Sequence, residues 1–284
     1  MNESAIFVRG LVRSFGERRA VDELDIDVAK HEFLGLLGPN GAGKTTTIQV
    51  LATLLAPTQG QVRVLGLDPA TQGSELRQRI GLVPQEIALY DELSAAENLE
   101  FLGKIYGLRG TRLGERVNWA LQAAGLEDRR RSRVGEFSGG MKRRLNLVSA
   151  LLHEPELVFL DEPTAGVDPQ SRNHLFEMIE GLRGQVTLVY TTHLMGEVER
   201  LCDRIVVMDE GRLVAAGTLA ELHAAQAAKA GESRTLELAQ NTDMQAATAL
   251  LREHGFEVEC GSETPDLESI FLALTGKDLR DGSE

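Results

Sequence analysis

Residues 38–45 read GPNGAGKT, in which three glycines precede a lysine and a threonine. Glycine tolerates backbone conformations that other residues avoid, so successive N–H groups of this loop can turn toward phosphate oxygens. An apolar run at 33–37 leads in, and a helical pattern starting at Lys44 adds the partial positive charge of a helix N-terminus. The pattern predicts a triphosphate cradle in which Lys44 reaches the β- and γ-phosphates and the Thr45 hydroxyl binds Mg²⁺. The residues predicted to form the cradle are Gly38, Pro39, Asn40, Gly41, Ala42, Gly43, Lys44, Thr45 and Thr46.

Two carboxylates follow a second apolar run, LVFLDE at 157–162. Asp161 stands where a strand would emerge, so we expect it to hold the Mg²⁺ shell. Glu162, one residue further, points in another direction and could polarise a water for attack on the γ-phosphate. An isolated acidic pair at a strand end is usually a solvated turn. Together with the cradle, this pair predicts nucleotide hydrolysis.

A histidine, His193, follows a third apolar run, TLVYTT. A lone histidine is more often structural or merely exposed. In an open α/β sheet, however, ligands bind at the carboxyl ends of the strands, and His193 would share that edge with Asp161. We therefore expect His193 to contact the γ-phosphate.

The elements that must position these residues alternate between strand and helix patterns, which indicates an α/β fold. Several apolar runs show no polar alternation, which favours strands buried on both faces of a largely parallel sheet. Strands are predicted at 33–37, 81–83, 157–160, 187–191 and 205–208, and helices at 44–55, 95–106, 115–124, 140–152, 169–181 and 195–201.

The pattern changes near Thr218, so we expect a main nucleotide-binding domain at 1–220 and a small α+β accessory or regulatory domain at 221–284. An Ala-rich stretch leads into a linker and then into alternating strands and helices. These segments are the Ala-rich stretch 219–230, the linker 231–233, the strands 235–239 and 256–260, and the helices 244–254 and 266–274.

The composition of the 284 residues, 42% hydrophobic and 26% charged, is that of a globular protein. A formal net charge of -13 argues against a nucleic-acid partner. Cys202 and Cys260 are far apart and have no metal-ligand spacing, so no metal cluster is expected. The opening MNESAIFVRG lacks the layout of a signal peptide, and no apolar run reaches the ~18–20 residues that span a bilayer. Any membrane connection should therefore come through a partner.

Further motifs resemble those of ABC ATPases. FSGGM at 137–141 is similar to the signature sequence of that family, and it precedes the acidic pair by about twenty residues, as the family requires. Gln85 matches the Q-loop glutamine, AGVD at 165–168 resembles the D-loop, and His193 matches the switch histidine. Phe15 resembles the aromatic residue that stacks on adenine.

The resemblance implies a P-loop NTPase fold of the ABC ATPase type: a RecA-like core, an N-terminal β subdomain and a helical subdomain at about 86–155. It implies that ATP and Mg²⁺ are bound, with Gln85 joining Thr45 and Asp161 at the metal. It also implies catalytic roles for Glu162, His193 and Gln85. In the family, the signature of one subunit closes on the ATP of the other, which assigns that contact to Ser138, Gly139 and Gly140.

The implied partners are a second copy or a paralogous ATPase, together with separate membrane permease subunits at the cytoplasmic face of the cell membrane. Met141 stands where many members have glutamine, which puts one side-chain hydrogen bond in doubt. Ser-Gly-Gly-Met and the C-terminal PDLESIFLALTG resemble the ATPases of bacterial drug and antibiotic exporters of the ABC-2 type. These features favour export over import, whereas the cargo is not encoded in this chain.

Two sets of residues have open interpretations. Leu89, Tyr90, Leu93 and Leu99 form either a socket for the membrane subunit or ordinary helix core. Seven basic residues between Arg129 and Arg144 form either a solvated face or a cluster that attracts nucleotide or positions the closing surface of the dimer.

Three other classes of P-loop protein fit less well. An ABC ATPase of DNA repair would carry a coiled-coil insertion, and no heptad array separates Lys44 from Asp161. A ribosome-acting ABC factor normally has two cassettes, whereas this chain has one. A P-loop kinase or GTPase would lack the signature and the Q-loop.

Overall fold

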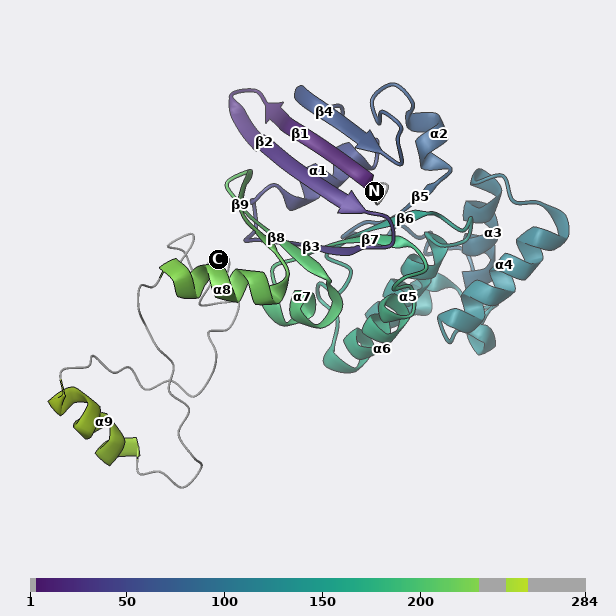
Figure 1. Ribbon diagram of the computed structural model, residues 1–284. Coiled ribbons are helices and arrows are strands. Elements are labelled where there is room, and N and C mark those ends of the chain that lie inside the picture. Colours follow the sequence, from purple (N-terminus) through teal and green to yellow (C-terminus); the bar gives the residue numbers. More distant parts are fainter. Residues whose placement is uncertain (1–3, 230–243, 255–284) are drawn as a thin grey trace.

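A six-stranded sheet forms the centre of the protein, whose computed structural model describes residues 4–229 and 244–254 (Figure 1). The strand order is β5–β6–β7–β3–β8–β9, in which the first five are parallel and β9 is antiparallel to β8. The strands are β5 (Ile80–Val83), β6 (Leu157–Asp161), β7 (Thr187–Thr192), β3 (Phe33–Leu37), β8 (Arg204–Asp209) and β9 (Arg212–Gly217).

The register of this sheet brings three chemically important segments to one edge. Leu37, the last residue of β3, pairs with Thr192, the last residue of β7. Asp161, the last residue of β6, pairs with Thr191. The loops that follow β3, β6 and β7 therefore leave the sheet side by side, at the carboxyl edge where open α/β sheets bind ligands.

A second, three-stranded antiparallel sheet covers one face of the first. Its order is β2–β1–β4, with β1 (Ser4–Phe15), β2 (Arg18–Ala29) and β4 (Gln59–Val64). The helix α1 (Lys44–Leu51) lies between the two sheets, and its Ile48 and Leu51 belong to a core cluster shared with both (Figure 1). This packing fixes the start of α1, and hence the cradle.

Helices cover the other face of the central sheet, because successive side chains of a strand point to opposite sides. In β3, Leu34 packs in the cluster that contains α1, whereas Phe33 packs with Leu175 of α6 (Pro169–Glu180). The neighbouring helix α7 (Met195–Leu201) contributes Val198 to a further cluster beside β3 and β8.

Three helices form a separate bundle with its own hydrophobic core (Figure 1). They are α3 (Ala95–Ile105), α4 (Gly110–Ala123) and α5 (Gly139–Ser149). A capping box starts α3: the Ser94 side chain accepts from the Glu97 N–H, and the Glu97 carboxylate accepts from the Ser94 N–H. Leu99 is fully buried in this bundle, so it belongs to the helix core and not to a socket for a partner.

The predicted parallel strands are all present, and helix boundaries differ most from the expectations. The first helix was predicted to reach 55, but α1 ends at Leu51 because Thr53 adopts a positive φ of 69°. The helix predicted at 115–124 begins earlier, at Gly110, and the one predicted at 140–152 ends at Ser149. The strands β1, β2, β4 and β9 and the short helix α2 (Gly73–Arg77) were not predicted individually.

In the C-terminal part, α8 (Leu219–Lys229) occupies the Ala-rich stretch and α9 (Met244–Glu253) occupies the helix predicted at 244–254. The linker at 231–233, the strands at 235–239 and 256–260, and the helix at 266–274 lie outside the described residues.

Candidate active site

The loop before α1 has a backbone that requires glycine. Gly41 and Gly43 have φ values of 84° and 96°, in the region that side chains disfavour. A Cβ on Gly43 would also lie 2.5 Å from the Ala20 carbonyl oxygen. The loop therefore curls tightly against the β1–β2 hairpin, and its N–H groups are available to a ligand at the start of α1.

Lys44 extends from this loop as a buried cation. Its Nζ donates to the carbonyl oxygens of Gly38 at 2.7 Å and Pro39 at 3.0 Å, and lies 3.5 Å from Glu162 Oε1. Burial lowers the pKa of Lys44, and the nearby Glu162 carboxylate opposes that shift. A desolvated ammonium gains most from additional negative charge, which a phosphate chain would supply.

Side-chain oxygen atoms from three residues lie close together at the end of β6. Asp161 Oδ1 accepts from Thr45 Oγ1 at 3.1 Å and from Thr191 Oγ1 at 2.6 Å. Burial raises the pKa of Asp161, and the two hydroxyl hydrogen bonds act in the opposite direction. Mg²⁺ is bound in proteins by one or two carboxylates with additional oxygen ligands, so the adjacent Thr45 and Asp161 fit this ion.

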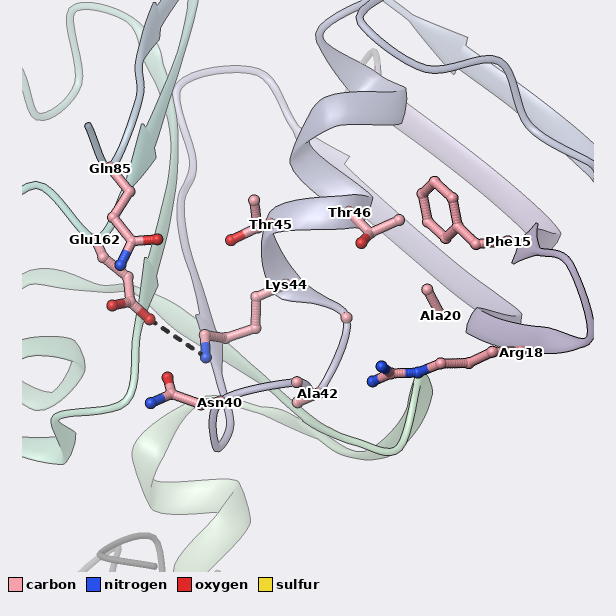
Figure 2. Close-up of a pocket in the computed structure, with 12 residues that line it drawn as sticks. Phe15, Arg18, Ala20, Asn40, Ala42, Lys44, Thr45, Thr46, Gln85 and Glu162 are labelled. Carbon is pink, nitrogen blue, oxygen red and sulfur yellow. Dashed lines mark ion pairs between the residues drawn. The ribbon is translucent and has the colours of Figure 1, made fainter. Parts of the chain in front are cut away.

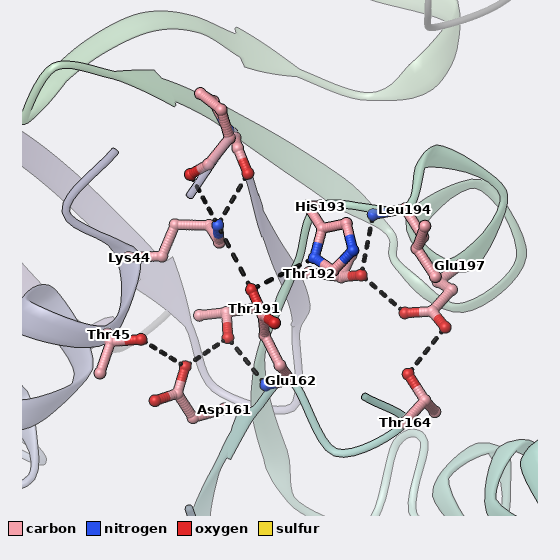
Figure 3. A network of polar contacts seen from close by, with 12 residues as sticks. Lys44, Thr45, Asp161, Glu162, Thr164, Thr191, Thr192, His193, Leu194 and Glu197 are labelled. Carbon is pink, nitrogen blue, oxygen red and sulfur yellow. Dashed lines mark hydrogen bonds and ion pairs between the residues drawn. The ribbon is translucent and has the colours of Figure 1, made fainter. Parts of the chain in front are cut away.

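Glu162 has an unusual backbone conformation, with a φ of 44°. Its N–H donates to Thr191 Oγ1 at 3.0 Å, which ties it to β7. Its carboxylate Oε1 lies 3.4 Å from His193 Nδ1, in addition to the contact with Lys44 (Figure 3). The structure thus brings together Lys44, Glu162 and His193 from the ends of three strands. Strain of this kind is typical of functional sites.

A cavity of about 520 Å³ extends from this cluster toward the β1–β2 hairpin (Figure 2). Gln85 and Glu162 line one end, whereas Phe15 lines the other and is half exposed. The guanidinium carbon of Arg13 lies 4.5 Å from the centroid of the Phe15 ring. The lining residues are Phe15, Arg18, Ala20, Asn40, Gly41, Ala42, Gly43, Lys44, Thr45, Thr46, Gln85 and Glu162.

Arg18 and Ala20 were not predicted to line the cavity. No sequence motif marks them, and they reach the cavity only because β1 and β2 form a hairpin beside the cradle. Gly38, Pro39, Asp161 and His193 do not line the cavity directly. They contact its lining residues instead, as described above.

The signature residues stand apart from this cavity, since Ser138, Gly139 and Gly140 are not among its lining. Ser138 caps α5, where its Oγ accepts from the Met141 N–H at 3.3 Å, and both Ser138 and Gly139 are exposed. Met141 is partly buried against the helical bundle. Within one chain the exposed N-terminus of α5 therefore does not meet the chain's own cradle.

The basic segment at 129–144 is partly engaged in internal contacts, so it is not simply a solvated face. Arg143 donates to the carbonyl oxygens of Gln85 and of Ala165, the latter at 3.0 Å. Lys142 pairs with Asp91 at 2.7 Å. Arg143 thus connects α5 to two loops near the cavity, a role that the sequence did not reveal.

The fold and the site together define a P-loop nucleotide hydrolase, and comparison with known proteins identifies its family. The model of the ABC transporter family matches residues 21–165. A linearmycin resistance ATP-binding protein, LnrL, of Bacillus subtilis (strain 168) is 39% identical over 95% of this chain and 97% of its own. The Nod factor export ATP-binding protein I of Cupriavidus metallidurans (strain ATCC 43123 / DSM 2839 / NBRC 102507 / CH34) is 36% identical over 96% of this chain and 98% of its own.

A solved structure of the ATP binding subunit of an ABC transporter is 31% identical, with a TM-score of 0.72, over 81% of this chain and 95% of that chain. The chain belongs to the ABC transporter family, as an ATP-binding subunit that binds and hydrolyses ATP. Such subunits dimerise and work with membrane permease subunits. None of the helices in the described part of the chain has the length and apolarity needed to cross a bilayer.

The two signature glycines predict different responses to substitution. A Cβ on Gly140 would lie 2.1 Å from Ser171 Oγ and 2.5 Å from Ser171 Cβ, whereas a Cβ on Gly139 would meet nothing within 4 Å. Gly140→Ala should therefore destabilise the protein by about 1–3 kcal/mol, the usual cost of overpacking. Gly139→Ala is the matched control and should change stability by no more than about 0.5 kcal/mol. Denaturant unfolding of both variants checks this, and equal midpoints would contradict the packing of α5 on α6.

Proposed function

We propose that this chain drives export of a substrate through separate membrane subunits, working as a dimer that closes around ATP and Mg²⁺. The observation that carries the proposal is the position of the Glu162 carboxylate, which lies between the Lys44 ammonium and the His193 imidazole at the edge of the cavity. A carboxylate at that position can accept a proton from a water that attacks the γ-phosphate.

The other site residues take complementary roles. Lys44 and the N–H groups of the cradle bind the phosphates, His193 contacts the γ-phosphate, and Phe15 stacks on the adenine. Thr45, Asp161 and Gln85 would hold Mg²⁺, which supplies neutralisation of the phosphate charge when it is bound. Support for the metal site comes from the 3.1 Å contact between Thr45 Oγ1 and Asp161 Oδ1, and from Gln85 in the same cavity lining.

The dimer is proposed because the signature and the cradle do not meet within one chain. Ser138 and Gly139 are exposed at the N-terminus of α5, whose backbone N–H groups and dipole favour a phosphate ligand. We infer that these residues, with Gly140, bind the γ-phosphate of ATP held by the second subunit. That second subunit is either another copy of this chain or a paralogous ATPase.

Export is favoured by the relatives. The Cupriavidus relative is named for Nod factor export and the Bacillus relative for linearmycin resistance, and both align over nearly their whole length. We propose that this chain likewise serves an exporter of a small organic compound, from the cytoplasmic face of the membrane.

An exposed aromatic pair is the proposed docking point for the membrane subunit. Tyr90 and Phe101 are 48% and 42% exposed, and their rings meet edge to face with centroids 5.2 Å apart. Asn98, fully buried, holds this loop by accepting from the Tyr90 N–H at 2.8 Å and donating to the Tyr90 carbonyl at 3.0 Å. Ile105, the last residue of α3, is 60% exposed and lies one helical turn after Phe101. Tyr90, Phe101 and Ile105 therefore offer an exposed apolar surface, and Tyr90 follows Gln85 closely in the sequence.

The first prediction from this proposal concerns Glu162→Gln. The substitution keeps the shape of the side chain and removes the carboxylate, so ATP binding should persist while hydrolysis falls by about 10²–10⁴-fold. The variant should then accumulate as an ATP-bound dimer with Mg²⁺ present, whereas the wild type returns to monomers as ATP is consumed. Phosphate release and light scattering after size-exclusion chromatography, with and without ATP, measure both effects.

Glu154→Gln is the matched control, because Glu154 also has a positive φ, of 59°, but precedes β6 and does not line the cavity. It should hydrolyse ATP at the wild-type rate. If Glu162→Gln hydrolysed ATP at the wild-type rate, Glu162 would not be the residue that accepts the proton from the attacking water. An ATP-bound variant that stays monomeric, even when assembled with its membrane subunits, would contradict the closed dimer.

The second prediction concerns the docking surface. Replacing both Tyr90 and Phe101 by alanine should leave the ATPase activity of the isolated chain unchanged within about twofold, because neither side chain lines the cavity. The same variant should fail to stay with inside-out vesicles that contain the coexpressed membrane subunit. Leu54→Ala, which alters another exposed apolar side chain, is the control and should bind normally. Full retention of the double variant would exclude this surface.

A further inference from the structure

Glu197, in the first turn of α7, is a carboxylate with 4% exposure that accepts hydrogen bonds from three hydroxyls. Its Oε1 accepts from Thr164 Oγ1 at 2.7 Å. Its Oε2 accepts from Tyr190 Oη at 2.8 Å and from Thr192 Oγ1 at 2.7 Å. Figure 3 shows Glu197 between Thr164 and Thr192, next to the cluster formed by Lys44, Glu162 and His193.

The positions of these donors in the chain are informative. Thr164 follows Glu162 by two residues, and Thr192 directly precedes His193. The Thr192 hydroxyl also accepts from the Leu194 N–H at 3.0 Å, so hydrogen bonds fix the chain on both sides of His193. One buried carboxylate therefore links the turn after Glu162 to the turn that carries His193.

Burial of a carboxylate costs free energy because the charge loses its hydration, and an apolar side chain of similar size would avoid this desolvation penalty. The hydrogen bonds to Glu197 offset that penalty and have a fixed geometry. Tyr190 remains a donor, because burial and the neighbouring Glu197 charge both raise the pKa of its phenol. Where an apolar side chain would make only packing contacts, Glu197 makes directional hydrogen bonds to the turn after Glu162 and to the turn that carries His193.

We propose that Glu197 is a positioning residue for ATP hydrolysis: it holds the His193 turn and the turn after Glu162 so that His193 Nδ1 and Glu162 Oε1 stay in contact. The inference rests on the proposed catalytic roles of Glu162 and His193. Glu197 does not line the cavity, so it acts on the rate of hydrolysis and not on the binding of ATP.

The test compares Glu197→Gln with Glu199→Gln, which makes the same chemical change at an exposed residue of the same helix. Glu197→Gln should lower kcat by about 10–100-fold, the scale expected when a catalytic group is misplaced by about 1 Å. Its Kd for MgATP should stay within about twofold of the wild type. Glu199→Gln should match the wild type in both quantities.

A double-mutant cycle with His193→Ala separates positioning from a general loss of stability. If Glu197 acts through the His193 turn, adding Glu197→Gln to His193→Ala should cost less than about threefold in kcat. A loss in the double variant equal to the product of the two single losses would overturn the inference. Wild-type kcat in the folded Glu197→Gln variant, or a loss confined to ATP binding, would also overturn it.

Folding is checked by circular dichroism and thermal unfolding. If Glu197→Gln fails to fold, Thr164→Val and Thr192→Val replace it. Each removes one donor to Glu197 with little change in shape, and Thr192→Val also removes the acceptor of the Leu194 N–H. They should reproduce the loss in kcat at unchanged Kd, and wild-type kcat in both would contradict the inference. The His193→Ala variant alone tests the proposed catalytic role of His193, on which this inference rests. If that role is wrong, His193→Ala will hydrolyse ATP at the wild-type rate, whatever the effect of changing Glu197.

Discussion

The buried ammonium of Lys44 is the interaction on which the site depends. A cation with 4% exposure is held by the carbonyls of Gly38 and Pro39 and by the Glu162 carboxylate, and burial still lowers its pKa. Its environment is incompletely neutralised for a charge removed from water. The negative charge of a polyphosphate would complete this environment, so we expect the Lys44 site to favour such a ligand.

The central sheet makes this arrangement possible because β3, β6 and β7 are buried at every residue and end at the same edge of the sheet. The loop after β3 carries the cradle, Asp161 ends β6 and Glu162 follows it, and the loop after β7 carries His193. Thr191 of β7 ties β7 to the end of β6, because its hydroxyl donates to Asp161 and accepts from the Glu162 N–H. The groups proposed for catalysis are therefore positioned by the register of the sheet and by hydroxyl hydrogen bonds, whereas the signature motif lies on the helical bundle.

Much of the fold and of the candidate site could be predicted from the sequence, for physical reasons that differ between regions. The apolar strands and the cradle are local signals, because a fully buried parallel strand and a glycine-rich turn each need particular residues in a row. The pairing of β1 with β2 has several register shifts, which interrupt the alternation of buried and exposed side chains. These two strands were therefore harder to predict from the sequence. Contacts of Arg143 and Glu197 join residues far apart in the chain, and no single-sequence pattern encodes them. Leu99 shows the same limit, since helical spacing alone cannot distinguish a core face from a docking face.

The role of the Lys44 ammonium is tested most directly by measuring ATP binding and turnover of Lys44→Ala in the full chain, with Mg²⁺ present. Isothermal titration with ATP and phosphate release would be compared with the wild type, and with Lys142→Ala, which removes a lysine that pairs with Asp91 outside the cavity. Lys44→Ala should bind ATP at least about tenfold more weakly and lose measurable turnover, while Lys142→Ala should retain both. Wild-type affinity and turnover in a folded Lys44→Ala protein would contradict this role.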